Sequence, residues 1–150
     1  MKSQIILCSG GARSGKSEFA ERLALATEGR KAYVATGQAF DDEMVDRIKK
    51  HQERRGNIWT NFEIPLYLAE EWQHISSVAD VILIDCLTMF TTNHMMAHGS
   101  IQGQQDANRL EDMVLSELEA LLNLIKVSDD KIVIFVTNEI GLGIVPDNKL

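Results

Sequence analysis

The chain has 150 residues, of which 45% are hydrophobic and 25% are charged. This length and balance predict one soluble domain over residues 1–150 and exclude disordered, collagen-like and coiled-coil proteins. Lys and Arg number 15 against 22 Asp and Glu, so the formal net charge is −7. Broad nucleic-acid binding needs a basic surface, and this acidic balance therefore argues against it.

Cysteine content and the lengths of the apolar runs indicate which further classes of protein are excluded. Cys8 and Cys86 lie in strand-like sequence and do not form a disulfide framework or a metal-type spacing. The residues from Met1 to Gln4 run directly into an apolar segment, with no signal peptide. No apolar run approaches the roughly 20 residues that a membrane span needs. We therefore expect a cytoplasmic protein without a membrane span.

Apolar runs alternate along the chain with segments of helical periodicity. Strands are expected at residues 5–8, 31–36, 81–85 and 132–136, with 58–63 also extended. Helices are expected at 17–26, from Asp41 or Asp42 to about 54, from Pro65 to about 74, at 87–96 and through 110–125, with a polar loop at 98–105. The runs at 5–8 and 81–85 read as buried strands. The alternation predicts an α/β fold with a mostly parallel sheet.

A phosphate-binding motif follows the first predicted strand and precedes the first helix. Its residues are Gly10, Gly11, Ala12, Arg13, Ser14, Gly15, Lys16 and Ser17, which fit the pattern G-x-x-x-x-G-K-[ST]. Small residues let successive backbone N–H groups surround a phosphate, and the helix start adds its positive dipole end. We expect Lys16 to contact the β- and γ-phosphates and Ser17 to bind Mg²⁺. The motif makes the predicted fold a P-loop NTPase-like three-layer sandwich.

Asp85 ends an apolar strand, the position of the second acidic motif of P-loop proteins. We interpret Asp85 as a partner of Mg²⁺, directly or through water. The alternative is an aspartate that caps the helix that follows.

The segment 47–55 is the one strongly basic stretch of this acidic chain. In a helix, Met44, Ile48, His51 and Arg55 share one stripe that would pack inward, while Lys49 points to solvent. A neutral imidazole there could attack phosphorus, with neighbouring arginines neutralising charge. The residues alone leave open a solvated basic face with an incidental histidine.

The order and spacing of these segments resemble one family across almost the whole chain. The matching residues are Gly10 to Ser17, Tyr33-Val34-Ala35-Thr36, Asp42-Glu43-Met44, Arg47-Ile48 with His51 and Arg55, Trp59, Glu63, Pro65, Asp85-Cys86-Leu87-Thr88 with Asn93, and 136–146. They resemble the bifunctional adenosylcobinamide kinase / adenosylcobinamide-phosphate guanylyltransferase family of cobalamin biosynthesis. Members of that family continue beyond the region of Pro146 with a further helix and strand, which we expect this domain to lack.

The resemblance implies a two-step activity. ATP or GTP phosphorylates adenosylcobinamide, and GMP is then transferred from GTP to adenosylcobinamide phosphate through a GMP-histidine intermediate. His51 is the matching histidine, Lys16 is the second catalytic residue, and Thr36 joins the nucleotide contacts. Arg54 and Arg55 would hold charged oxygens, and Glu63 would accept from the guanine N1–H and amine unless it is a plain surface residue. The resemblance also implies a homo-oligomer, with a ring-like trimer as the family form.

Two other functions are compatible with the same residues. One is a simple P-loop small-molecule kinase in which His51 has no covalent role. The other is an inactive, truncated nucleotide-binding fragment. Labelling of the protein by GTP marked on its α-phosphate separates the first from the bifunctional enzyme, and product formation from adenosylcobinamide would exclude the second.

Overall fold

The computed structural model describes residues 1–11, 14–38, 41–97 and 103–138, and the predicted loop residues 98–102 and segment 139–150 lie outside these ranges. One parallel sheet has the strand order β1-β5-β4-β2-β3. Its strands are β1 (Gln4–Gly10), β2 (Lys31–Ala35), β3 (Trp59–Glu63), β4 (Val81–Asp85) and β5 (Ile132–Asn138). The helices are α1 (Lys16–Leu25), α2 (Asp42–Arg55), α3 (Leu68–Val78), α4 (Leu87–Ala97) and α5 (Gln104–Val127), with a 3-10 turn at Gly56–Ile58.

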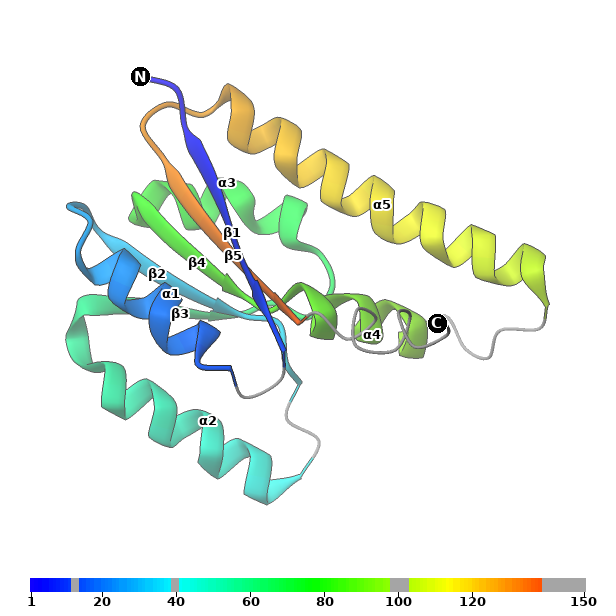
Figure 1. Cartoon of the computed structure of the whole chain (residues 1–150), viewed down its shortest axis with the longest axis horizontal. Coiled ribbons are helices and arrows are strands. Elements are labelled where there is room, and N and C mark those ends of the chain that lie inside the picture. Colours follow the sequence, from blue (N-terminus) through cyan, green and yellow to red (C-terminus); the bar gives the residue numbers. More distant parts are fainter. Residues whose placement is uncertain (12–13, 39–40, 98–102, 139–150) are drawn as a thin grey trace, which may run out of the picture.

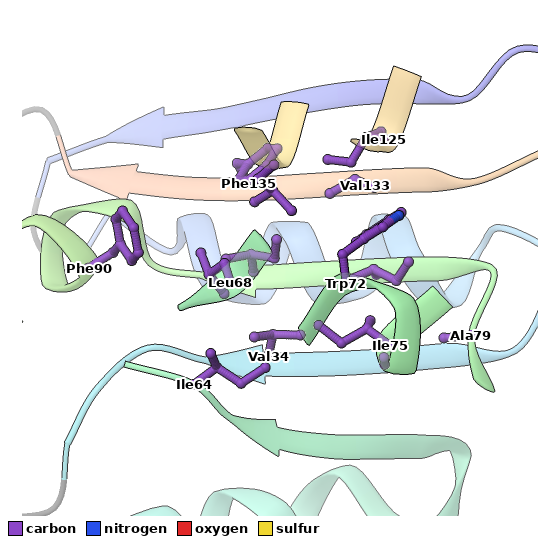
Figure 2. Packing of buried hydrophobic residues seen from close by; sticks show 14 of the residues in the cluster. Val34, Ile64, Leu68, Trp72, Ile75, Ala79, Phe90, Ile125, Val133 and Phe135 are labelled. Atoms are coloured by element: carbon purple, nitrogen blue, oxygen red, sulfur yellow. The ribbon is translucent and has the colours of Figure 1, made fainter. Parts of the chain in front are cut away.

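The centre of the sheet is covered on both faces, which confirms the predicted three-layer α/β fold (Figure 1). Ile82 and Ile84 of β4 pack with residues of α3 and α5, whereas Val81 and Leu83 pack with α1. Alternate side chains of a strand point to opposite faces, so an uninterrupted apolar run serves two cores. Figure 2 shows the first core, in which Leu68 and Trp72 face the sheet residues Val34 and Val133.

Residues 5–8 form a strand, as predicted, but the prediction that this strand is buried is wrong. β1 is the edge strand of the sheet and pairs with β5 alone among the described strands. Cys8 is buried, but Ile5 is 41% and Leu7 61% exposed. An apolar run is consistent with an edge strand as well as a central one, and periodicity does not separate the two.

The boundaries of α2 and α3 have identifiable causes. Asp41 rather than Asp42 is the N-cap of α2, because its Oδ1 accepts from the Met44 N–H at 2.8 Å. The helix predicted to begin at Pro65 begins instead at Leu68. Pro65 lies in the connection between β3 and α3. Its carbonyl accepts a hydrogen bond from Asn93 Nδ2 of α4 at 3.1 Å, so this connection is attached to α4 before α3 begins.

Two further observations concern the cysteines and the helices of the described part of the chain. Cys8 and Cys86 are buried free thiols. No described helix combines the length and the apolar content that crossing a bilayer requires.

An ion-pair cluster joins the amino-terminal ends of the strands. Asp80 accepts from the backbone N–H of Arg30 at 2.9 Å and from its Nε at 3.0 Å, and Lys131 Nζ lies 3.5 Å from Asp80 Oδ1. Lys131 also donates to the carbonyl of Ala79 at 2.8 Å. Hydrogen bonds from Arg30 hold the pKa of Asp80 well below its usual range.

We predict that Asp80→Asn lowers the free energy of unfolding in a pH-dependent way. A carboxylate whose pKa is depressed in the folded protein contributes fully above its unfolded pKa of about 3.9 and loses that contribution as the pH falls further. The difference between wild type and Asp80→Asn should therefore be full at neutral pH and shrink below about pH 4. Urea unfolding across this range measures it, with the exposed Asp112→Asn as control; a difference independent of pH would contradict the assignment.

Candidate active site

The phosphate loop connects β1 to α1 at the carboxyl edge of the sheet. Gly15 has φ +81°, a left-handed conformation that favours glycine. A Cβ on Gly10 would lie 2.7 Å from Ser14 Oγ, so the serine hydroxyl would have to move to admit a side chain there. The Ser14 N–H donates to the Gly11 carbonyl at 3.2 Å and closes the turn. Ala12 and Arg13, which we also expect in this loop, lie outside the described residues.

The first two residues of α1 contact different parts of the site. Lys16 Nζ donates to the Gly11 carbonyl at 3.2 Å, so the lysine folds back along its own loop. Ser17 Oγ donates to Asp85 Oδ2 at 3.2 Å. The Ser17 hydroxyl and the Asp85 carboxylate, which the sequence analysis expects at Mg²⁺, are therefore in direct contact.

Asp85 ends β4 and receives two hydroxyl groups on one oxygen. Besides Ser17, Tyr33 Oη donates to Asp85 Oδ2 at 2.5 Å. Tyr33 belongs to β2 and its ring is buried, with the Trp59 ring at a centroid distance of 5.8 Å in edge-on contact. Burial first, and then the charge of Asp85, raise the pKa of Tyr33 above its usual value. The phenol is therefore a hydrogen-bond donor at neutral pH.

A cleft of about 360 Å³ opens beside this carboxylate, a volume within the usual range of ligand pockets. Its walls come from the phosphate loop, α1, β2, β4 and α2. The lining residues are Ser14, Gly15, Lys16, Ser17, Glu18, Glu21, Tyr33, Ala35, Ile48, His51, Arg54, Arg55 and Asp85. The fold thus brings the predicted phosphate site and the basic helix to one cavity.

His51 lines this cleft but does not pack inward as the helical stripe predicts. Met44, Ile48 and Arg55 are partly buried, as expected for that stripe, whereas His51 is exposed. Lys49 is exposed, as predicted. The imidazole is thus accessible from the cleft rather than buried in packing.

Both arginines at the end of α2 have protein partners. Arg54 Nη2 lies 3.7 Å from Glu21 Oε2 of α1. The guanidinium carbon of Arg55 lies 3.6 Å from the centroid of the Tyr33 ring, and its Nε and Nη2 donate to Asn61 Oδ1 at 3.3 and 2.9 Å. Burial lowers the pKa of Arg55. The arginines therefore connect α2 to α1, β2 and β3.

Four described residues expected at the nucleotide do not line the cleft: Gly10, Gly11, Thr36 and Glu63. Thr36 is fully buried: its hydroxyl donates to the Cys86 carbonyl at 2.6 Å and accepts from the Cys86 N–H at 2.9 Å. Its own carbonyl accepts from Asn93 Nδ2 at 2.6 Å. With these polar groups engaged, Thr36 fixes the turn after Asp85. Glu63 is exposed at the end of β3, next to Ala35 in register, and does not line the cleft.

Sequence reasoning gave no role to Tyr33, Glu21 or Asn61. A tyrosine in an apolar strand resembles a core residue, although a buried phenol needs a partner, and that need is a usable signal. Glu21 follows Ser17 by four residues and so shares its helix face. Asn61 carries no such local signal, because its partner Arg55 depends on how β3 follows α2 in space.

A glycine-containing phosphate loop between a strand and a helix, with a serine and a strand-end aspartate in contact beside it, defines a P-loop nucleotide-binding enzyme. The sequence profile of the cobinamide kinase / cobinamide phosphate guanyltransferase family matches residues 6–150. The chain belongs to this family.

Curated relatives agree with this assignment. The bifunctional adenosylcobalamin biosynthesis protein CobU of Escherichia coli (strain K12) is 34% identical, over 97% of this chain and 81% of the relative. CobU of Salmonella typhimurium (strain LT2) is 37% identical with the same shares. The bifunctional adenosylcobalamin biosynthesis protein CobP of Pseudomonas aeruginosa is 40% identical, over 96% of this chain and 76% of the relative.

We predict that Thr36→Val destabilises the protein by about 1–3 kcal/mol, because the buried Cys86 N–H loses its acceptor. Thr36→Ser keeps the hydroxyl and should retain most of the stability. Urea unfolding of both variants measures the difference. A Thr36→Val protein as stable as wild type would show that these hydrogen bonds contribute little to stability.

Proposed function

We propose that this chain phosphorylates adenosylcobinamide with ATP or GTP, and that it then transfers GMP from GTP to adenosylcobinamide phosphate through His51. The observation that carries the covalent step is that His51 and the phosphate loop line the same cleft. Membership of the kinase and guanyltransferase family supports both activities.

In the kinase step, the substrate hydroxyl oxygen attacks the γ-phosphorus. A new O–P bond forms, the bond from phosphorus to the β–γ bridging oxygen breaks, and the nucleoside diphosphate leaves while the hydroxyl proton is lost to water or a base. Positioning and charge neutralisation supply most of the catalysis in such reactions. We propose that backbone N–H groups of the loop and Lys16, which line the cleft, hold the phosphates.

The residues beside the loop fit a magnesium ion. Ser17 Oγ and Asp85 Oδ2 are hard oxygen donors 3.2 Å apart, and the described residues hold no cluster of three or more His, Cys, Asp or Glu that would suggest another metal. Mg²⁺ is usually bound by one or two carboxylates together with water and substrate phosphates. When bound, it would neutralise phosphate charge; Ser17 and Asp85 are the side chains we propose to hold it.

In the guanylyl-transfer step, the neutral His51 ring attacks the α-phosphorus of GTP. An N–P bond forms, the bond from phosphorus to the α–β bridging oxygen breaks, and pyrophosphate leaves. An oxygen of adenosylcobinamide phosphate then attacks the same phosphorus, the N–P bond breaks, and adenosylcobinamide-GDP leaves with His51 restored. Neutral imidazole is a competent nucleophile for this exchange.

Of the two arginines, we propose Arg54 for direct contact with phosphate oxygens. Its pairing with Glu21 is long at 3.7 Å, and its side chain is 58% exposed. The Glu21 side chain is only 16% exposed, but the separation is close to the limit for an ion pair. We therefore propose that a nucleotide phosphate replaces Glu21 as the partner of Arg54. Arg55 is held more closely, by Tyr33 and Asn61.

We also propose that the protein works in the cytoplasm as a homo-oligomer, for which the family resemblance implies a trimer. Exposed apolar side chains on edge strand β1 and on α1, namely Leu7 and Phe19, line one groove. Contiguous apolar surface of this kind is typical of interaction sites.

We predict that His51→Ala abolishes covalent labelling by GTP marked on its α-phosphate, because the attacking nitrogen is lost. Wild type should form an acid-labile, base-stable adduct in the presence of Mg²⁺. His74→Ala, at an exposed histidine of α3, is the matched control and should label like wild type. No label on folded wild type that binds GTP would favour the simple kinase or an inactive nucleotide-binding protein.

We predict that Glu63→Ala reduces the preference for GTP over ATP in guanylyl transfer. A carboxylate can accept from both the N1–H and the amine of guanine, which adenine does not offer together. Competition between the two labelled nucleotides measures the preference, with the exposed Glu70→Ala as control. A Glu63→Ala protein that keeps the full preference would remove Glu63 from this role.

A further inference from the structure

Helix α2, which carries His51, is weakly attached to the rest of the domain. It has no buried residue, and its sequence is polar on most of its surface. Its pairs Glu43–Arg47 at 3.7 Å and Asp46–Lys50 at 3.1 Å lie within the helix, so they support its conformation but do not attach it. Burial of an apolar face normally fixes a surface helix, and α2 lacks a fully buried one. Its position must therefore depend on specific contacts.

The closest of these contacts is made by Arg55, four residues after His51 and hence on the same face of the helix. The guanidinium lies over the Tyr33 ring at 3.6 Å, while Asn61 Oδ1 accepts two of its N–H groups. A planar guanidinium stacked on an aromatic face and fixed in its own plane has little freedom left. The Tyr33 ring thus sets where the last turns of α2, including His51, lie over the cleft.

The other end of Tyr33 contacts the phosphate side of the same cleft. Its hydroxyl donates to Asp85 Oδ2 at 2.5 Å, on the oxygen that also accepts from Ser17. The ring is buried against Trp59, so the side chain is held firmly between the two ends. One residue therefore contacts both the carboxylate beside the phosphate loop and the arginine that holds the histidine helix.

We infer that Tyr33 is a positioning residue for guanylyl transfer, acting through the stack of its ring with Arg55, and that its hydroxyl separately orients Asp85. This inference rests on the proposed function of His51. The two roles belong to different atoms of one side chain. Loss of the hydroxyl affects the phosphate end, which both reactions use, whereas loss of the ring affects the histidine helix, which only guanylyl transfer uses.

The pair Tyr33→Phe and Tyr33→Leu separates these roles. Both remove the hydroxyl, and only Leu removes the ring. We expect the two variants to share one kinase rate with adenosylcobinamide, which also shows that both are folded. We expect Tyr33→Leu to be labelled by α-labelled GTP about 100-fold more slowly than Tyr33→Phe at saturating GTP, since misplacement by about 1 Å can cost this much. The GTP dissociation constants of the two should agree within about threefold, because the phosphate loop is unchanged in both.

A double-mutant cycle tests whether Arg55 transmits the effect. Arg55→Lys keeps the charge but loses the planar stack and the paired N–H groups, so it should slow labelling as Tyr33→Leu does. The double variant should be no slower than either single one, because both remove the same contact. If Arg55 held phosphate directly, the two losses would multiply, which would overturn the inference.

The labelling experiments distinguish failure of this inference from failure of the proposed guanylyl transfer through His51. Absence of His51-dependent label on wild type would overturn the proposed function itself. Labelled wild type with Tyr33→Leu labelled as fast as Tyr33→Phe would leave the function intact and overturn the role of the ring. Tyr67→Leu changes the chain's other tyrosine, which is exposed before α3, and should label like wild type.

Discussion

The carboxylate of Asp85 is the contact on which the arrangement of the site depends. One oxygen accepts from Ser17 of α1 and from Tyr33 of β2, so three elements meet at the end of β4. Hydrogen bonds to a charged acceptor are stronger than neutral ones, and they lie here at the carboxyl edge of a parallel sheet, where such folds bind their ligands. The hydrogen bond from Ser17 to Asp85 attaches the start of α1 to the sheet, and it also brings two oxygen atoms together beside the phosphate loop.

The backbone behind Asp85 is fixed by a buried threonine. Thr36 makes two hydrogen bonds to Cys86 and presents its carbonyl to Asn93 of α4. The polar groups of Thr36 all have partners, which favours one geometry, whereas the buried Asn93 Oδ1 has no hydrogen-bond partner among the described residues. Thr36 therefore holds the turn that carries the aspartate, and the nucleotide contact that the family resemblance implies for it stays a prediction.

The histidine helix follows a different principle. It has no buried residue and is attached through the arginine side chains at its carboxyl-terminal end. Attachment by stacking and hydrogen bonds can be exchanged for contacts to a nucleotide more easily than attachment by a hydrophobic core. Such a helix can respond to a ligand while Arg55 and Tyr33 keep its end in register with the cleft.

Local sequence was sufficient for the phosphate loop and for β4, and it narrowed the cap of α2 to Asp41 or Asp42. Each of these depends on neighbouring residues: a glycine with φ +81°, an uninterrupted apolar run, and a side chain that binds the amide three residues on. The order of motifs along the chain likewise determined the family. Only the tertiary structure decided that β1 lies at the edge of the sheet, that Thr36 is buried, and that Tyr33 joins Asp85 to Arg55. The physical reason is that these properties depend on strand order and on contacts between residues far apart in the chain, such as Tyr33 and Asp85 at 52 positions, which local periodicity does not encode.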